Sequence, residues 1–198
     1  YYFTIQLSQR QNIKQDTKRL IDVSVVLALL PLWLPLALLV ACGVKIDSPG
    51  PALFSQRRTG MHGQSFRIWK FRSMRHETEL TPQFAQANDP RITRIGNFLR
   101  KTSLDELPQI WNVVLGDMSI VGPRPVPLTE LQMYGPRRDA YLAMRPGLTG
   151  AWQISGRNEV SYDERVRLDV GYFQGVCLRL DLKIILKTFK TVVNRTGL

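Results

Sequence analysis

The chain has 198 residues, 44% of them hydrophobic, which suits one ordinary domain with a real core. Lys and Arg number 27 against 16 acidic residues, so the formal net charge is +11. This balance favours anionic partners such as phosphates, nucleic acid or lipid headgroups. The cysteines Cys42 and Cys177 belong to no CxxC or histidine-rich cluster, so a structural disulfide or zinc site is not expected.

The first predicted element is an apolar segment, residues 23–44, which follows a polar segment at residues 1–17. A straight helix of this length could just cross a hydrocarbon core of about 30 Å. Basic residues flank it on both sides, which conflicts with a simple crossing because basic flanks prefer the cytoplasmic side. Pro31 and Pro35 near its centre should break the helix. We therefore expect a re-entrant helix hairpin over residues 20–45 rather than a spanning helix, the alternative that would make the chain a bitopic subunit.

Two short strands are predicted next, at residues 53–56 and 66–71, as a hairpin around the glycine-containing loop 59–63. Residues 76–86 are polar and are expected to form a loop or a short exposed helix. A boundary at 88–90 precedes a predicted helix at 91–101.

The C-terminal stretch 180–193 has apolar residues at helical spacing, with lysines on another face. This pattern is typical of a helix that lies in a membrane interface with its lysines toward anionic lipid. A surface helix that is docked on the domain and exposes its basic face to solvent fits the pattern equally well.

Several common catalytic motifs are absent. The sequence contains no GxxxxGK[ST], GxGxxG, HExxH or GxSxG element, and its only histidines, His62 and His76, have no plausible partner. Phosphate chemistry in this chain would therefore have to depend on carboxylates, arginines and a metal ion.

An adjacent acidic pair, Asp105 and Glu106, stands out in this basic chain. In the structural interpretation, Asp105 is the N-cap of a helix over residues 106–115 that Gly116 closes. In the catalytic interpretation, the helix N-terminus keeps the carboxylate ionised, so that it can attack phosphorus or hold a divalent cation. Arg124, in the stiff Gly-Pro-Arg-Pro turn, is suited to bidentate phosphate recognition, but spacing alone does not place it beside Asp105.

Four motifs in order resemble the bacterial sugar transferase family, the monotopic phosphoglycosyl transferases: SPGPALFSQRRTG, KFRSM, RKTSLDELPQIWNVVLGDMSIVGPRP and RPGLTGAWQISGRN. The resemblance runs from about Lys18 to the C-terminus. It implies a helix-rich α/β catalytic domain at 18–198, associated with the cytoplasmic face of the bacterial inner membrane through a re-entrant hairpin and interfacial amphipathic helices. It also implies transfer of a sugar phosphate from a UDP-sugar to undecaprenyl phosphate, in two steps, with Mg²⁺ and release of UMP.

The resemblance also implies the site residues. Asp105 would be the nucleophile that forms a covalent aspartyl phosphosugar, and Glu106 would coordinate the metal with it or orient the site. Arg100 and Arg124 would hold phosphates, and Lys70 would lie near the nucleotide. Galactose or glucose is favoured over an N-acetylhexosamine as the sugar.

The chain departs from the family pattern at one point. Members often carry a Ser-Pro pair at the helix break, where this chain has Leu34-Pro35. Beyond the dyad, Gly147 and Gly150 are expected in turns, and Trp152 and Tyr172 are expected to pack. Nucleic acid is not expected as a partner, and a homo-oligomer is possible. The alternative function is a non-catalytic membrane-tethered protein that binds nucleic acid or anionic lipid through its basic surface.

Overall fold

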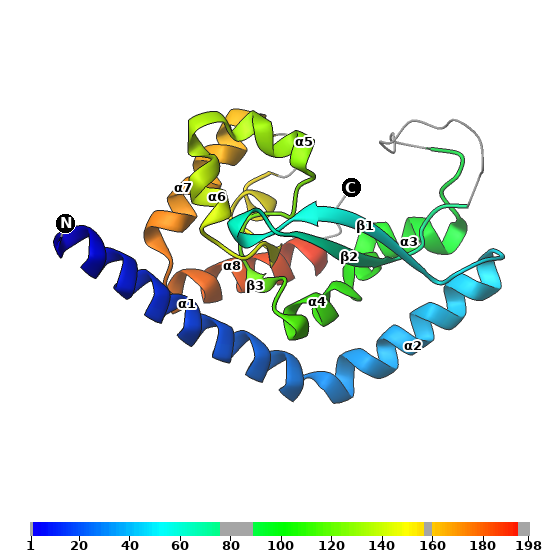
Figure 1. The fold of residues 1–198 in the computed structure, drawn as a ribbon. Helices are drawn as coiled ribbons and strands as arrows, with labels where there is room; N and C mark the ends of the chain where they lie inside the picture. The colour runs from blue at the N-terminus through cyan, green and yellow to red at the C-terminus, as the bar shows by residue number, and fades with distance from the viewer. Residues whose placement is uncertain (1, 76–88, 157–159, 194–198) are drawn as a thin grey trace.

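Two long helices form one edge of the molecule. The computed structural model describes residues 2–75, 89–156 and 160–193. Helix α1 (Tyr2–Ala28) and helix α2 (Leu30–Asp47) meet at Leu29 in a bent pair that runs beneath the other elements (Figure 1). Residues 2–17 of the polar segment and the start of the apolar run therefore belong to one continuous helix.

The break between these helices differs from the prediction. Pro31 lies in the first turn of α2, next to the break, whereas Pro35 lies inside α2 and the helix continues past it. The break expected at Leu34-Pro35 is therefore wrong. At the actual break, the indole Nε1–H of Trp33 donates a hydrogen bond of 3.0 Å to the carbonyl oxygen of Val26. An uninterrupted helix would pair that carbonyl with a backbone N–H, so the Trp33 indole supplies the donor that a serine hydroxyl could have supplied.

Trp33→Phe should weaken this break, because it keeps most of the ring packing and removes the donor to Val26. We expect a loss of about 1 kcal/mol, the usual net value of one hydrogen bond, which is a fall in melting temperature of about 2–4 °C. Thermal unfolding in detergent micelles would measure it. Trp111→Phe is the control, because Trp111 is exposed. Equal shifts for the two variants would show that the Trp33 hydrogen bond contributes nothing.

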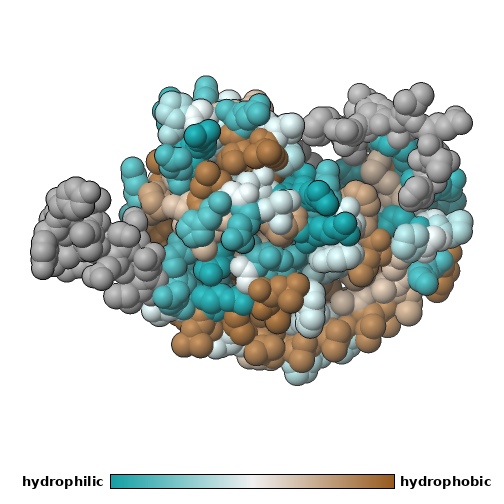
Figure 2. All heavy atoms as spheres, in the orientation of Figure 1, coloured by the Kyte–Doolittle hydropathy of each residue, from teal (hydrophilic) through white to brown (hydrophobic). Residues whose placement is uncertain are grey.

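The outer surface of α2 is apolar. By length and composition α2 could cross a membrane, and among its described side chains only Val44 is buried. Figure 2 shows hydrophobic side chains along the edge formed by α1 and α2. The most exposed large apolar residues there are Leu20, Leu27, Leu32, Leu38, Leu39 and Ile46. A crossing helix and a re-entrant one would both expose such a surface, so the re-entrant topology stays a prediction.

A β-hairpin follows α2, as predicted. Strands β1 (Leu53–Thr59) and β2 (Ser65–Phe71) pair antiparallel, with Ser55 opposite Trp69, and the 3-10 turn η1 (Met61–Gly63) connects them. Strand β1 extends beyond the predicted end at Gln56. The loop or helix predicted at 76–86 falls outside the described residues.

The remaining elements make a small helix-rich α/β domain, which confirms the helix-rich α/β part of the predicted fold class. Strands β3 (Ser119–Val121) and β4 (Gly147–Thr149) pair parallel in a second two-stranded sheet. The helices and 3-10 turns are α3 (Arg94–Thr102), η2 (Leu104–Glu106), α4 (Gln109–Leu115), α5 (Leu128–Leu131), η3 (Gln132–Arg137), α6 (Arg138–Leu142), η4 (Trp152–Ile154), α7 (Tyr162–Gly175) and α8 (Leu178–Val193). Cys42 and Cys177 are free thiols.

Helix α3 confirms the helix predicted at 91–101, with a later start. The Thr93 hydroxyl oxygen caps it by accepting a hydrogen bond of 2.9 Å from the amide of Gly96. A side chain at Gly96 would collide with the backbone of Ser73, so glycine is needed for α3 to pack against the segment after β2.

Helix α8 confirms the predicted C-terminal helix. Ile184 is 1% exposed and packs in the core beside Tyr172, whereas Leu182, Leu186 and Phe189 are exposed. The helix is thus docked on the domain through one face and presents an apolar surface on another. Its predicted placement in a membrane interface stays a prediction.

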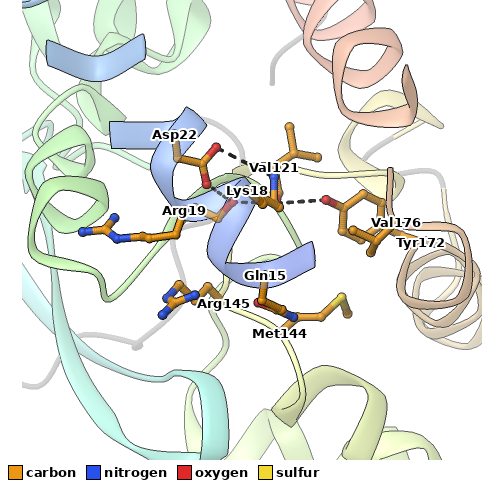
Figure 3. A pocket seen from close by; sticks show the side chains of 10 residues that line it. Gln15, Lys18, Arg19, Asp22, Val121, Met144, Arg145, Tyr172 and Val176 are labelled. Carbon is orange, nitrogen blue, oxygen red and sulfur yellow. Dashed lines mark hydrogen bonds and ion pairs between the residues drawn. The ribbon is translucent and has the colours of Figure 1, made fainter. Parts of the chain in front are cut away.

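A buried polar network attaches α1 to the domain. Lys18 Nζ lies 2.6 Å from Asp181 Oδ2 on α8 and 3.8 Å from Asp22 Oδ1, and the Ser119 hydroxyl donates to Asp22 at 2.6 Å. Tyr172, whose hydroxyl lies 2.6 Å from Asp181 Oδ1, is a packing residue as predicted. Figure 3 shows Lys18 and Asp22 of α1 facing Tyr172. Since these contacts come just before the apolar run, they fix the direction in which that run leaves the domain.

Candidate active site

The acidic pair lies in the 3-10 turn η2, between α3 and α4. Helix α3 ends at Thr102, and its C-cap residue Ser103 adopts a left-handed conformation with φ of 56°. Helix α4 starts at Gln109, with Pro108 at the N-cap position and no side-chain cap. The predicted N-cap role of Asp105 is therefore wrong, because Pro108 makes α4 begin later and leaves the acids in a separate turn. Gly116, at φ of 96°, closes α4 as predicted.

Asp105 has an unusual environment for a carboxylate. Burial raises the pKa of Asp105 to about 6, Lys70 opposes this rise, and the adjacent Glu106 adds to it. Asp105 accepts no hydrogen bond from the residues that the structure describes. The expectation that local amides and a helix dipole would keep it ionised is wrong, because Asp105 is not at the start of α4. Asp105 is a partly desolvated carboxylate whose pKa lies close to neutral pH.

Glu106, by contrast, is held by cations. Lys70 Nζ lies 2.6 Å from Glu106 Oε1, and Arg124 Nη1 lies 3.7 Å from the same oxygen. The position of Lys70 depends on Asn112 of α4, which is 1% exposed and binds the edge of β2. Its side-chain amide donates to the carbonyl oxygen of Arg67 at 2.8 Å. This contact docks α4 on β2 and brings the lysine to the dyad.

The loop that carries Arg124 is placed by close backbone packing. Side chains at Gly147 or Gly150 would collide with the backbone of Gly122, so both glycines serve this close approach. The turn role predicted for Gly147 is wrong, because it lies in β4. On the other side of Arg124, the amide of Thr59 donates to the carbonyl oxygen of Val126 at 2.8 Å. The end of β1 and the Arg124 loop are thereby fixed together.

These contacts create a basic pocket beside the dyad. Its polar lining consists of Arg58, Lys70, Glu106, Gln109, Arg124 and Gln153. Burial and the nearby charge of Arg124 lower the pKa of Arg58, which shows that two guanidinium groups share this region. Close like charges are unfavourable unless an anion neutralises them, so the pocket is suited to phosphate.

Sequence reasoning missed Arg58 as a site residue. It precedes Thr59 at the end of β1, and the neighbouring Arg57 projects to the opposite face of the strand. The Gln-Arg-Arg-Thr-Gly stretch signalled a basic strand end, but only the pairing of Thr59 with Val126 shows which arginine meets Arg124.

Arg58→Ala should reduce affinity for the anionic substrate, because it removes a pocket cation. We expect about a tenfold to hundredfold loss in kcat/KM, on the scale of one hydrogen bond to a charged group. Arg57→Ala is the matched control, with the same chemistry on the other face of the strand, and should change kcat/KM less than about threefold. Steady-state kinetics with varied donor would test this pair. Equal losses of kcat/KM in the two variants would mean that Arg58 contributes only to the overall positive charge of β1 and has no specific contact with the substrate.

Arg100 acts on Asp105 and is not part of the pocket lining, so its predicted role in holding phosphates stays a prediction. It lies in the last turn of α3, and its charge is among those that oppose the rise in the pKa of Asp105. It does not line the basic pocket. The structure therefore joins Lys70 and Arg124 to Glu106, beside Asp105, and the charges of both Arg100 and Arg124 act on Asp105.

The dyad fits a magnesium ion only with help from substrate. In the part of the chain that the structure describes, no group of three or more His, Cys, Asp and Glu side chains could hold a metal ion. Mg²⁺, however, is usually bound by one or two carboxylates together with waters and substrate phosphates. Asp105, which accepts no hydrogen bond from the described residues, and Glu106 beside it are a donor set of that kind.

A basic pocket next to an acidic pair defines an anion-handling site of the kind that transfers phosphoryl groups. The chain belongs to the bacterial sugar transferase family, which it matches over residues 13–195. This agrees with the resemblance seen in the motifs.

Three relatives illustrate the family. The chain is 43% identical to "Undecaprenyl-phosphate galactose phosphotransferase" of Salmonella typhimurium, over 98% of this chain and 44% of that protein. It is 42% identical to "UDP-glucose:undecaprenyl-phosphate glucose-1-phosphate transferase" of Escherichia coli, over 91% of this chain and 41% of that protein. It is 44% identical to "Exopolysaccharide production protein ExoY" of Rhizobium meliloti, over 91% of this chain and 87% of that protein. The chain thus spans less than half of the first two relatives.

Proposed function

We propose that the chain transfers a hexose 1-phosphate from a UDP-sugar to undecaprenyl phosphate and releases UMP, a first membrane step of exopolysaccharide, O-antigen or capsule assembly. The observation that carries the proposal is the convergence of Arg58, Lys70 and Arg124 on a pocket beside the Asp105-Glu106 pair. The names of the relatives, which specify galactose or glucose and undecaprenyl phosphate, supply the substrates.

In the first step, an oxygen of ionised Asp105 attacks the phosphorus that bears the sugar. The bond from that phosphorus to the bridging oxygen breaks, and UMP leaves with the electron pair. The result is an aspartyl phosphosugar. The desolvated state of Asp105 suits this role, because a weakly solvated carboxylate with no hydrogen-bond partner among the described residues is a stronger nucleophile.

In the second step, an oxygen of undecaprenyl phosphate attacks the same phosphorus and releases Asp105 as a carboxylate. The product is undecaprenyl diphosphate sugar. The acceptor is already an anion, so neither step needs a histidine base. The pocket cations neutralise the charge that gathers on the phosphoryl oxygens, which is the main requirement of phosphoryl transfer.

Mg²⁺ is proposed as the cofactor, held by Asp105 and Glu106 with substrate phosphates. When bound, it would neutralise charge on the pyrophosphate. The Lys70 contact orients Glu106 toward the pocket side of the turn.

The membrane is proposed as the second partner. The exposed apolar edge of α1 and α2 and the outer face of α8 would rest in the cytoplasmic leaflet of the bacterial inner membrane, where undecaprenyl phosphate is available. A re-entrant path of the α1–α2 pair keeps both flanking basic segments on the cytoplasmic side.

The test is UMP release by purified protein with Mg²⁺, undecaprenyl phosphate and a panel of UDP-galactose, UDP-glucose and UDP-N-acetylglucosamine. Omission of the acceptor should leave a burst of UMP equal to the enzyme concentration, together with a hexose phosphate adduct seen by intact-protein mass spectrometry. Release from one hexose donor, with loss in EDTA, would support the proposal. If no donor in the panel gives UMP release and the protein binds nucleic acid or anionic vesicles in a salt-dependent way, the non-catalytic alternative is supported instead.

A further inference from the structure

The indole ring of Trp152 contacts two guanidinium groups. The ring centroid lies 4.6 Å from Arg165 Cζ and 5.9 Å from Arg124 Cζ, both within cation–π range. Trp152 is 9% exposed and lies in η4, just after β4, so it packs next to the Arg124 loop. Two cations on one buried ring need an explanation beyond simple packing.

Arg165 is the fixed member of this group. Its side chain is 12% exposed, its Nη1 lies 2.8 Å from Glu130 Oε1, and its guanidinium also lies 5.3 Å from the ring centroid of Tyr162. The carboxylate of Glu130 balances its charge. Arg165 therefore provides a rigid, electrically compensated support on one side of the indole.

Arg124 is the more exposed and less constrained member of this group. Its side chain is 39% exposed, and its ion pair with Glu106, at 3.7 Å, is longer than a hydrogen bond. A long side chain held this loosely loses rotamer freedom when it binds an anion, and that loss weakens binding. An aromatic face beside the guanidinium reduces the number of rotamers before binding.

We propose that Trp152, supported by Arg165, is a positioning residue that holds the Arg124 guanidinium toward the pyrophosphate of the bound nucleotide sugar. The choice of pyrophosphate rests on the function proposed above. Arg165 does not touch the ligand in this arrangement, and its role passes through the indole. The class of ligand recognised through Arg124 is a diphosphate.

The indole face, rather than its N–H, is the active part. The buried Trp152 Nε1 has no hydrogen-bond partner among the described residues. Trp152→Phe therefore keeps an aromatic face and loses no such bond, whereas Trp152→Leu removes the face and keeps an apolar side chain. The two variants separate an aromatic support from simple filling of the core.

The experiment measures the affinity of the full chain in detergent micelles for inorganic pyrophosphate by isothermal titration calorimetry. We expect Trp152→Leu and Arg165→Gln each to weaken Kd about fivefold to tenfold, the scale of one cation–π contact, and Trp152→Phe to stay within about threefold. The matched controls are Trp111→Leu, at an exposed tryptophan, and Arg167→Gln, at an exposed arginine of the same helix. Both should bind like wild type.

The decisive measurement is repeated in an Arg124→Ala background, where Trp152→Leu and Arg165→Gln should have no further effect on Kd. Equal weakening with and without Arg124 would overturn the proposal, as would wild-type affinity in both single variants or no pyrophosphate binding by the wild type. If Trp152→Leu melts early, Arg165→Gln decides the result alone. UMP release is measured separately, so coupled pyrophosphate binding without turnover would retain this inference and reject the proposed reaction.

Discussion

Asp105→Asn should reduce UMP release by at least about a thousandfold, because the amide cannot form the acyl phosphate on which both steps depend. The acceptor-free burst and the hexose phosphate adduct should disappear together. Donor affinity measured in EDTA should remain near that of the wild type, since the cations of the pocket are untouched. The measurement is stopped-flow or quenched UMP release, with intact-protein mass spectrometry on the same samples.

The same substitution should make the protein more stable at neutral pH. The pKa of Asp105 is about 6 in the folded chain, above its ordinary value near 3.8. The folded state therefore binds this proton more tightly, and the stability it contributes is present below about pH 4 and lost as the pH rises through about 6. In EDTA at pH 8 we expect the Asp105→Asn variant to melt about 2–4 °C above wild type. This corresponds to a gain of about 1 kcal/mol in the free energy of unfolding, a value reduced to allow for solvent screening. The gap should shrink toward pH 4.

Glu106→Gln is the matched control for the stability measurement. It makes the same chemical change one residue along, but Glu106 accepts a charge-assisted contact from Lys70 at 2.6 Å. Its loss leaves a partly buried lysine without that carboxylate, so the melting temperature should fall rather than rise. A fall in the Asp105→Asn variant as well would mean that Asp105 is stabilised in the fold, contrary to its raised pKa. Turnover in that variant would show that Asp105 is not the nucleophile.

The elements predicted correctly from the sequence depend on local signals. The hairpin follows from two β-rich stretches around a glycine loop, and α3 from the stretch that begins after the boundary at 88–90. The end of α4 follows from Gly116 in the left-handed conformation. In each case the decisive residue and its partner lie within a few positions of one another, so the pattern contains the information.

The predictions that failed depend on contacts or choices that the pattern does not contain. The break between α1 and α2 lies at Leu29 and not at Pro35. A hydrogen bond from the indole N–H of Trp33 to the carbonyl oxygen of Val26 stabilises it. Gly147 looks like a turn residue in sequence, yet it is in β4 because the backbone of Gly122 packs against it.

The candidate site was predictable in its residue types and not in its electrostatics. The motifs identified Asp105, Glu106, Lys70 and Arg124, which the structure brings together. The pKa of Asp105 depends on burial by segments far away in sequence, so a local helix-dipole argument gave the wrong direction.

Lys70→Met should produce the second large effect, and it should depend on pH. Lys70 is the strongest of the charges that oppose the rise in the pKa of Asp105, so its removal should move that pKa above about 6. Less of Asp105 is then ionised at neutral pH, and Glu106 also loses its 2.6 Å contact. We expect kcat/KM to fall about a hundredfold at pH 7, on the scale of a lost charged hydrogen bond plus incomplete ionisation.

The pH profile distinguishes this mechanism from a general loss of charge. In the Lys70→Met variant the acid limb of kcat/KM should move to higher pH, with partial recovery by about pH 8.5 as Asp105 ionises. Lys70→Arg, which keeps the charge, should leave the limb near its wild-type position. Lys101→Met removes an exposed lysine of α3 and should change neither the rate nor the limb. An unmoved limb in Lys70→Met would mean that Lys70 acts on the substrate or on Glu106 and does not control the ionisation of the nucleophile.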